Sequence, residues 1–404
     1  MNGGAGLHPE AVTGPLAGVR IVDLTVNVLG PVATQILGDM GADVIKVEPP
    51  QGDGNRRLGS ENHPNMGALY VTMNRNKRSV VLDLKRPAAL EALMRLVETA
   101  DVFVHGMRAR AAERLGVGYA AVAARNPRIV YAFAPGYRAD GPYADRPAYD
   151  DVIQGESGVT GMYYLLSGEP HYVPTVLADK FCGFVLASSI GMALFNRERT
   201  GRGQEVQVPM LETMLSFNLI EHLWRGAFDQ PTEALGYPRL LTPFRRPYAT
   251  KDGHICLMAA SDEQWKRLLG ALGRPELAEE ERFATLVNRS RHIEDLYAIV
   301  AEQATQHTTA EWQERLDAAD IPNGPARKLE DLQKDPYLVA TGFFQRYGHP
   351  TEGPMVTTSI PVRFSRTPGS LRLPPPCLGE HTRPVLREHR YSEQDIDEIS
   401  GDHS

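Results

Sequence analysis

Short apolar runs alternate with segments of helical periodicity over the first half of the chain. Five of these runs predict strands, at residues 19–24, 43–48, 79–84, 101–105 and 128–134. Pro31 opens a predicted helix that ends before Gly41, and residues 87–99 predict another helix. A strand, a helix and a second strand in this order form a right-handed parallel crossover. The pattern therefore predicts an α/β domain built on an open parallel sheet.

The pattern changes near residue 221. Residues 248–258 predict a short hairpin, and two later helices begin at capping-box pairs, Ser261 with Gln264 and Thr308 with Glu311. We expect a flexible tail over residues 1–14, a large α/β domain over 15–220, a small α+β domain over 221–335, and a C-terminal segment over 336–404 with a last helix capped by Ser392. Residues 135–173 are rich in Gly, Pro, Asp and Tyr, so we expect them to form functional loops.

Composition narrows the range of partners. A chain of 404 residues, 42% of them hydrophobic, is long enough for two domains. Its net charge of -7 makes nucleic acids and anionic membranes poor partners. The longest apolar stretch, residues 184–195, is shorter than the roughly 20 residues of a spanning helix. Three widely spaced cysteines fit a reducing cytoplasm, and no Cys or His spacing indicates a metal site.

The first predicted crossover invites a dinucleotide-binding interpretation. Glu48 ends the second strand, where an acidic residue often contacts a ribose hydroxyl. The turn at residues 25–30, however, has one glycine where the dinucleotide fingerprint needs three. NAD binding is therefore disfavoured, and the alternative is an ordinary sheet with no ligand at this turn.

A basic cluster is the next candidate. Residues 74–78 read Asn-Arg-Asn-Lys-Arg, with Lys85 downstream and Arg56 and Arg57 upstream. In an acidic chain such a cluster beside strand ends suits a phosphorylated ligand. The alternative, a solvated charged face, stays open. A lone histidine such as His105 is more often structural.

Asp179 precedes a long apolar segment, residues 180–195, which contains several small residues. The segment predicts a buried helix with Asp179 as its N-cap. A cap is the simpler interpretation. The same position also suits a nucleophilic carboxylate, because the helix dipole and free N–H groups keep a carboxylate ionised and stabilise charge on an attacked carbonyl.

Several segments form a specific pattern when they are taken in order, at residues 15–24, 41–48, 76–85, 140–147, 197–206 and 378–382. Together they resemble the class III CoA-transferase family, which includes formyl-CoA transferase, carnitine CoA-transferase and α-methylacyl-CoA racemase. The resemblance implies a Rossmann-like large domain, to which the C-terminal segment returns, a small domain, and a homodimer of two interlinked chains. It implies that Asp179 is the catalytic nucleophile and that Leu82, Lys85 and Arg114 contact CoA.

The resemblance also implies a mechanism. Asp179 attacks the donor acyl-CoA and forms a mixed anhydride, which CoA converts to an aspartyl-CoA thioester. A free carboxylic acid then attacks that thioester, and CoA resolves the second anhydride. CoA is therefore a substrate, and no tightly bound cofactor is expected.

Two features of the chain bear on its place in the resembled family. Racemases have a histidine where this chain has Tyr149, and tyrosine is a poor base near neutral pH. Transfer is therefore favoured over the alternative of an acyl-CoA racemase or epimerase. Gly106 and Met107 stand where the family often has Asn-Phe, so Arg108 or Arg110 is expected to compensate in CoA binding. A second alternative is a nucleotide-binding protein without transferase activity.

Overall fold

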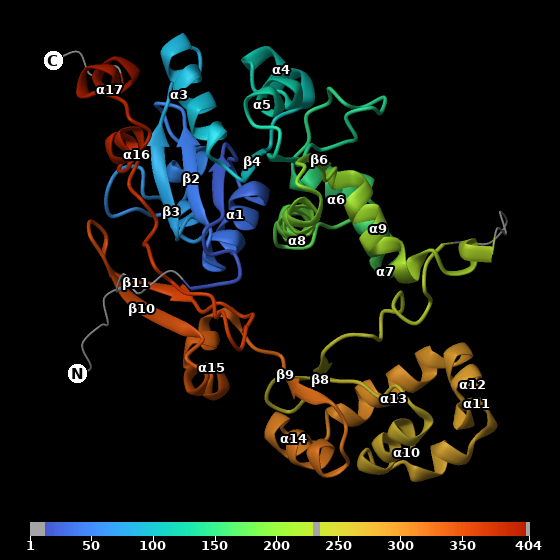
Figure 1. The fold of residues 1–404 in the computed structure, drawn as a ribbon. Helices are drawn as coiled ribbons and strands as arrows, with labels where there is room; N and C mark the ends of the chain where they lie inside the picture. The colour runs from blue at the N-terminus through green and yellow to red at the C-terminus, as the bar shows by residue number, and fades with distance from the viewer. Residues whose placement is uncertain (1–12, 229–234, 401–404) are drawn as a thin grey trace. The chain divides into compact units, whose positions relative to one another are not determined.

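The computed structural model describes residues 13–228 and 235–400 (Figure 1). Most of the predicted tail over residues 1–14 lies outside these ranges. The chain divides into two compact units. Unit 1 comprises Met1–Val159, Tyr172–Phe217 and Thr341–Ser404, and unit 2 comprises Thr160–His171 and Asn218–Ala340.

Unit 1 is built on a six-stranded, wholly parallel sheet of order β3-β2-β1-β4-β5-β6. Its strands are β1 (Arg20–Asp23), β2 (Asp43–Glu48), β3 (Lys77–Val81), β4 (Val102–His105), β5 (Val130–Phe133) and β6 (Gln204–Gln207). The predicted α/β class and parallel sheet are confirmed. The third strand lies two to three residues earlier than predicted, and β6 was not predicted because its alternating polar sequence lacks an apolar run.

Helices cover both faces of this sheet, because the crossovers before and after β3 run in opposite directions. The helices of unit 1 include α1 (Leu29–Asp39), α2 (Ala68–Val71), α3 (Pro87–Glu98), α4 (Ala109–Leu115), α5 (Tyr119–Arg125), α6 (Asp150–Glu156), α8 (Leu177–Thr200), α16 (Thr382–Glu388), α17 (Glu393–Ser400) and the 3₁₀ helix η1 (Gly54–Arg57). Residues of α3, α5, α16 and α17 share one apolar core with β4 and β5.

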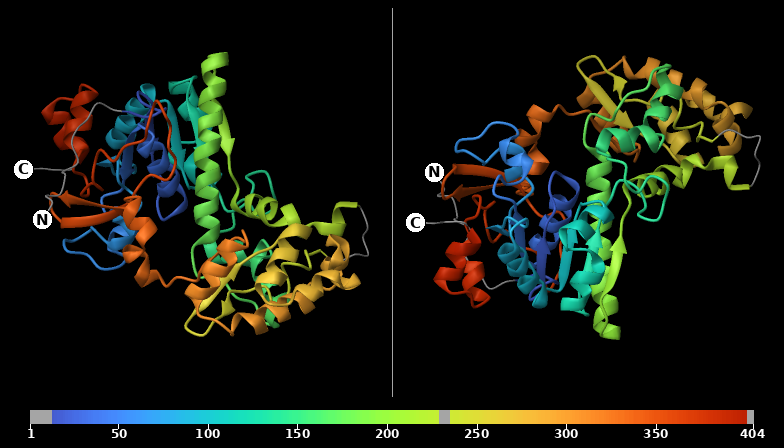
Figure 2. Two further views of the ribbon diagram at one scale, coloured as in Figure 1. Left: turned by 90° about the horizontal axis from the view of Figure 1, so that it is seen from below. Right: turned by 90° about the horizontal axis from the view of Figure 1, so that it is seen from above.

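The long helix α8 packs closely on α1 (Figure 2). A Cβ on Gly183 of α8 would lie 2.7 Å from the carbonyl oxygen of Leu29 on α1. The prediction that small residues permit close packing of this helix is therefore confirmed. The prediction that the helix is buried is wrong for its other face, where Phe184, Met192 and Phe195 are exposed. By length and composition alone α8 is apolar enough to cross a bilayer, but its buried face, which includes Cys182, Leu186 and Ile190, is accounted for by packing inside unit 1.

The C-terminal part of unit 1 borders β3. This part begins with a hairpin of β10 (Phe344–His349) and β11 (Gly353–Thr358), and the segment before α16 then runs along β3. The backbone N–H of His381 donates to the Ser79 carbonyl at 2.9 Å, and Val81 N–H donates to Thr382 Oγ1 at 2.9 Å. These bonds tie the segment before α16 to the outer edge of β3. The final helix α17 begins after Ser392, as predicted.

The segment 135–173 was predicted to be loops, and this is wrong in part. It contains α6 (Asp150–Glu156) and α7 (Val159–Ser167). Asp150 and Asp151 stand in the first turn of α6, where acidic side chains complement the helix dipole. The many glycines and tyrosines concealed this helix signal in the sequence.

Unit 2 contains a three-stranded antiparallel sheet of β7 (Tyr248–Ala249), β8 (His254–Leu257) and β9 (Asn323–Pro325), so the predicted hairpin is confirmed. Both predicted capping boxes are present, at the start of α10 and of α14. The remaining elements are α9 (Met210–His222), η2 (Trp224–Phe228), α10 (Asp262–Ala271), η3 (Pro275–Glu279), α11 (Glu281–Ala284), α12 (Leu286–Arg291), α13 (Ile293–Ala304), α14 (Thr309–Ala318), η4 (Leu329–Lys334) and α15 (Pro336–Ala340), with α9 crossing from unit 1 to unit 2.

Candidate functional site

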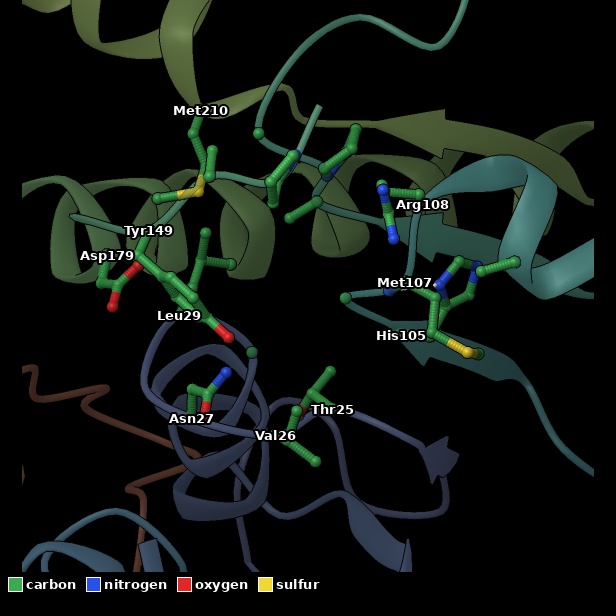
Figure 3. A pocket seen from close by; sticks show the side chains of 18 of the residues that line it. Thr25, Val26, Asn27, Leu29, His105, Met107, Arg108, Tyr149, Asp179 and Met210 are labelled. Carbon is green, nitrogen blue, oxygen red and sulfur yellow. Dashed lines mark hydrogen bonds between the residues drawn. The ribbon is translucent and has the colours of Figure 1, made fainter. Parts of the chain in front are cut away.

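A cavity of about 380 Å³ lies in unit 1 at the carboxyl ends of β1, β4 and β5 (Figure 3). In the sheet order, β1 and β4 are the neighbours from which the chain winds in opposite directions. Ligands of open α/β sheets bind outside the carboxyl ends of the strands at such a switch point. The lining residues come from the ends of these strands, from the loops and helix starts that follow them, and from the first turns of α8 and α9. They are Thr25–Asn27, Leu29, Gly30, His105–Arg108, Ala111, Ala134–Gly136, Arg146–Tyr149, Asp179 and Met210.

Asp179 lies in the first turn of α8, on the wall of this cavity. The helix begins at Leu177 with Val176 as N-cap, so the predicted N-cap position of Asp179 is wrong by three residues. Asp179 still lies in the region of positive helix dipole. Its own backbone N–H donates to Asp150 Oδ1 at 3.0 Å.

The carboxyl group of Asp179 is half-buried and has a strongly raised pKa. Desolvation by burial is the largest cause, and the negative charges of Asp150 and Asp151 add to it, which together raise the pKa of Asp179 to about 7. Within the described ranges no cation forms an ion pair with this group. The expectation that the helix end keeps this carboxylate ionised is therefore wrong, because burial and the two nearby carboxylates outweigh the helix dipole. The ionised form is poorly stabilised by its surroundings and is a stronger nucleophile than an exposed aspartate.

Tyr149 is the N-cap residue of α6 and lies beside Asp179 in the cavity (Figure 3). Its ring is 67% exposed. The structure therefore brings together the two residues that the sequence singled out as nucleophile and as occupant of the racemase histidine position.

The loop after β4 forms the wall farther from Asp179 (Figure 3). His105 is buried, and its Nδ1 accepts the Met107 N–H at 3.0 Å. Its Nε2 therefore carries the proton and donates to Tyr131 Oη at 2.7 Å, which donates to the Val117 carbonyl at 3.0 Å. Burial lowers the pKa of His105 to about 4. His105 is thus a neutral structural histidine, and its bond to Met107 fixes the loop that carries Arg108 into the cavity.

The turn after β1 forms a third wall. Asn27 has a left-handed backbone with φ of 63°, and its carbonyl accepts from Asn55 Nδ2 at 2.5 Å. The carboxylate of Asp23 accepts from the Thr25 N–H at 2.8 Å and from Thr34 Oγ1 at 2.6 Å. Sequence reasoning missed Asn27. Asparagine tolerates the left-handed region, so an asparagine in a short strand-to-helix turn was the available signal.

The three residues assigned to CoA lie outside this cavity. Leu82 follows β3, and its side chain is 1% exposed in the core. Lys85 is exposed in the turn before α3, and Arg114 is exposed in the last turn of α4. The structure does not bring them together with Asp179. Their role in CoA binding stays a prediction.

For the buried members of the basic cluster both interpretations are wrong, because they are neither a ligand site nor a solvated face, whereas Arg57 and Lys85 are exposed. Arg56, Lys77 and Arg75 are buried and pair with Glu48 (2.7 Å), Asp23 (3.5 Å) and Asp39 (2.7 Å), respectively. Hydrogen bonds from Arg56 and Ser79 and the charges of Lys46 and Arg56 outweigh desolvation and lower the pKa of Glu48 to about 2.

The same pairing tests the dinucleotide interpretation. Both oxygens of the Glu48 carboxylate are engaged, one by Arg56 Nε at 2.8 Å and the other by Ser79 Oγ at 2.7 Å. Glu48 is therefore not available to a ribose. Within residues 13–228 and 235–400 no group of three His, Cys, Asp or Glu side chains is placed to hold a metal ion.

Comparison with known proteins places these features in a family. The sequence profile of CoA-transferase family III matches residues 16–382. The chain is 33% identical over 387 residues to "Probable fatty acyl-CoA transferase Rv3272" of Mycobacterium tuberculosis, covering 92% of this chain and 97% of that protein. It is also 33% identical to "Succinate--glutarate CoA-transferase" of Agrobacterium fabrum, covering 93% and 95% of the two chains.

Solved structures agree with the sequence comparison. A crystal structure of Rv3272 superposes with a TM-score of 0.80 at 31% identity, covering 92% of this chain and 99% of that chain. A CAIB/BAIF family protein from Brucella suis superposes with a TM-score of 0.77 at 30% identity, covering 93% and 100%.

Proposed function

We propose that this chain, which belongs to CoA-transferase family III, transfers CoA from an acyl-CoA to a free carboxylic acid through covalent intermediates on Asp179. CoA-transferases use CoA thioesters as substrates, so no tightly bound cofactor is proposed. The single observation that carries the proposal is a half-buried carboxylate of raised pKa, without an ion-pair partner in the described ranges, in a cavity at the switch point of the sheet. The names of the relatives support the same chemistry in general.

The first step is attack by an Asp179 carboxylate oxygen on the thioester carbonyl carbon. A C–O bond forms, the C–S bond breaks, and the CoA thiolate leaves with the electron pair, which gives a mixed anhydride. The thiolate then attacks the Asp179 carbonyl and releases the donor acid, which gives an aspartyl-CoA thioester. The acceptor carboxylate then attacks the aspartyl-CoA carbonyl and releases the CoA thiolate, which gives a second anhydride. The thiolate attacks the acceptor carbonyl of this anhydride, which gives the new acyl-CoA and frees the Asp179 carboxylate.

Electrostatics of the cavity support these steps. The N-terminal end of α8 offers its positive dipole to the oxyanion that forms on the attacked carbonyl. Arg108 and Arg146 also line the cavity, and they suit carboxylate or phosphate oxygens. We propose that they hold the anionic parts of the substrates.

Tyr149 favours transfer over the alternative of racemisation. A racemase needs a base that removes the proton next to the thioester carbonyl, and the phenol of a tyrosine is a poorer general base than the imidazole of a histidine. We assign Tyr149 the role of a pocket wall and hydrogen-bond donor beside the acyl group.

For CoA itself we keep Leu82, Lys85 and Arg114 as proposed contacts. The buried side chain of Leu82 leaves only its backbone for a ligand, whereas the exposed cations Lys85 and Arg114 suit phosphates. Lys85 follows β3 and Arg114 follows β4, on the carboxyl side of the sheet. The strand order 3-2-1-4-5-6 supports a Rossmann-like description of this domain.

We also propose a cytoplasmic homodimer. Phe184, Met192 and Phe195 are exposed at helical spacing on α8, and a second copy of the chain is the partner that we propose for this apolar face. The three cysteines are free, which supports a reducing compartment. Light scattering tests the dimer, whose mass is twice the 44.5 kDa of one chain.

The main experiment mixes the purified protein with a panel of acyl-CoAs and free acids and follows new CoA esters by mass spectrometry. We expect exchange with at least one pair, and loss of exchange in Asp179→Ala. Full activity of Asp179→Ala, or no exchange with any pair, would overturn the proposal. Asp151→Ala, on the exposed side of α6, is the matched control.

Two further measurements separate the alternatives. Solvent deuterium incorporated next to the thioester without an acceptor acid would favour a racemase. Calorimetry with CoA and with NAD tests the nucleotide-binding alternative, and tight binding of NAD without CoA exchange would favour it.

A further inference from the structure

A second carboxylate, Asp150, is buried directly behind the nucleophile. Its side chain is 5% exposed, and it belongs to the first turn of α6. Oδ1 accepts the backbone N–H of Asp179 at 3.0 Å, and Oδ2 accepts Gln154 Nε2 at 2.6 Å. Among the described residues no cation pairs with Asp150, although unpaired buried carboxylates are costly. The proposed transfer steps do not use this group, so its placement needs another reason.

Gln154 extends the contact from α6 to the segment that leads into α8. Its Oε1 accepts the Val173 N–H at 2.9 Å, and its Nε2 also donates to the Thr175 carbonyl at 3.2 Å. Asp150 and Gln154 therefore hold the chain on both sides of the α8 start. The position of the Asp179 carboxylate depends on this clamp.

We propose that Asp150 is a positioning residue for the transfer reaction, which fixes the first turn of α8 and favours the acylated form of Asp179 by like-charge repulsion. This inference rests on the proposed function. Acylation replaces the carboxylate of Asp179 with a neutral anhydride or thioester. The negative charge passes to the departing thiolate or acid, farther from Asp150, so each acylation relieves the repulsion between the two carboxylates.

The other charged and titratable groups around Asp179 do not cancel this effect. Asp151, exposed on α6, adds a weaker repulsion of the same sign, and burial accounts for the largest part of the raised pKa. Lys180 is the next residue on α8, but its Nζ donates to Thr175 Oγ1. Cys182 lies one turn later, and its thiol is kept neutral by a pKa raised to about 12. The remaining groups of the cavity are Tyr149, His105, Arg108 and Arg146.

The variant Asp150→Asn tests the charge while keeping an acceptor for the Asp179 N–H. We expect the acidic limb of the kcat/KM profile to move to lower pH by about one unit. We also expect the equilibrium ratio of aspartyl-CoA thioester to free Asp179, measured at about pH 8 by mass spectrometry of the intact protein with acyl-CoA, to fall about tenfold. Asp151→Asn is the matched control, with a smaller shift of the same sign.

Gln154→Leu removes only the uncharged part of the clamp. This variant is expected to lower kcat without moving the acidic limb. If Asp150 had a purely structural role, Asp150→Asn would give the same result. If Asp150→Asn does not fold, Asp150→Ser, whose hydroxyl also accepts the Asp179 N–H, replaces it. An unchanged acidic limb together with an unchanged thioester ratio refutes the inference. If the wild-type protein forms no covalent thioester and exchanges no CoA, the proposed function itself fails.

Discussion

The raised pKa of Asp179 predicts that removing the nucleophile stabilises the fold. Because the pKa rises from 3.8 to about 7 on folding, the folded state opposes ionisation and loses stability as the pH rises from about 4 to about 7. A difference of about three units corresponds to at most about 4 kcal/mol at pH 8, and to about 2 kcal/mol at pH 5, where only part of the difference is expressed. The variant Asp179→Asn is free of this cost because its amide does not ionise.

Urea unfolding followed by circular dichroism at pH 5 and pH 8 measures the effect. We expect Asp179→Asn to be inactive and more stable than the wild type, with the larger gain at pH 8. A gain of equal size at both pH values, or a loss at pH 8, would contradict the reasoning, because only a titrating group makes the gain depend on pH. Asp151→Asn, exposed on the neighbouring helix, is expected to change stability by less than about 0.5 kcal/mol.

Three further predictions concern the surroundings of the cavity. Arg56→Met leaves Glu48 buried without its partner and is expected to cost about 3–5 kcal/mol in urea unfolding; a loss below 1 kcal/mol would contradict this. Leu82→Ala leaves a cavity in the core and is expected to lower the free energy of unfolding by about 2–5 kcal/mol. Lys85→Ala is expected to keep its stability and to raise the KM for acyl-CoA, and an unchanged KM would remove Lys85 from the CoA site. The ring of His105, with a pKa near 4, should show no NMR titration between pH 5.5 and 8, and a midpoint near 6.5 would show that its burial is not maintained in solution.

Local signals in the sequence were sufficient for much of the fold. Strand β2 lies at Asp43–Glu48, as predicted, because an apolar run bounded by glycine and proline is specified by its own residues. Both capping boxes form as predicted, because each is a bond between residues three apart. Strand β6 was missed, since the pairing that makes Gln204–Gln207 a strand comes from β5, more than 70 residues earlier.

Charged residues near the sheet were interpreted wrongly for a similar reason. Residue type and spacing show that Arg56, Arg75 and Lys77 are basic, but not which acids face them. Their partners Glu48, Asp39 and Asp23 lie on other segments and meet them only in the folded sheet. Three cations that look free in the sequence are therefore members of buried ion pairs.

The sequence by itself determined the alternation of strands and helices, the apolar segment after Asp179 and, through the resemblance, the family. Only the tertiary structure decided the environment of Asp179. Its pKa depends on burial and on Asp150, which is 29 residues earlier in the chain and is brought close by the packing of α6 on α8. Desolvation and Coulomb repulsion act through distances in space, and a linear sequence does not record those distances.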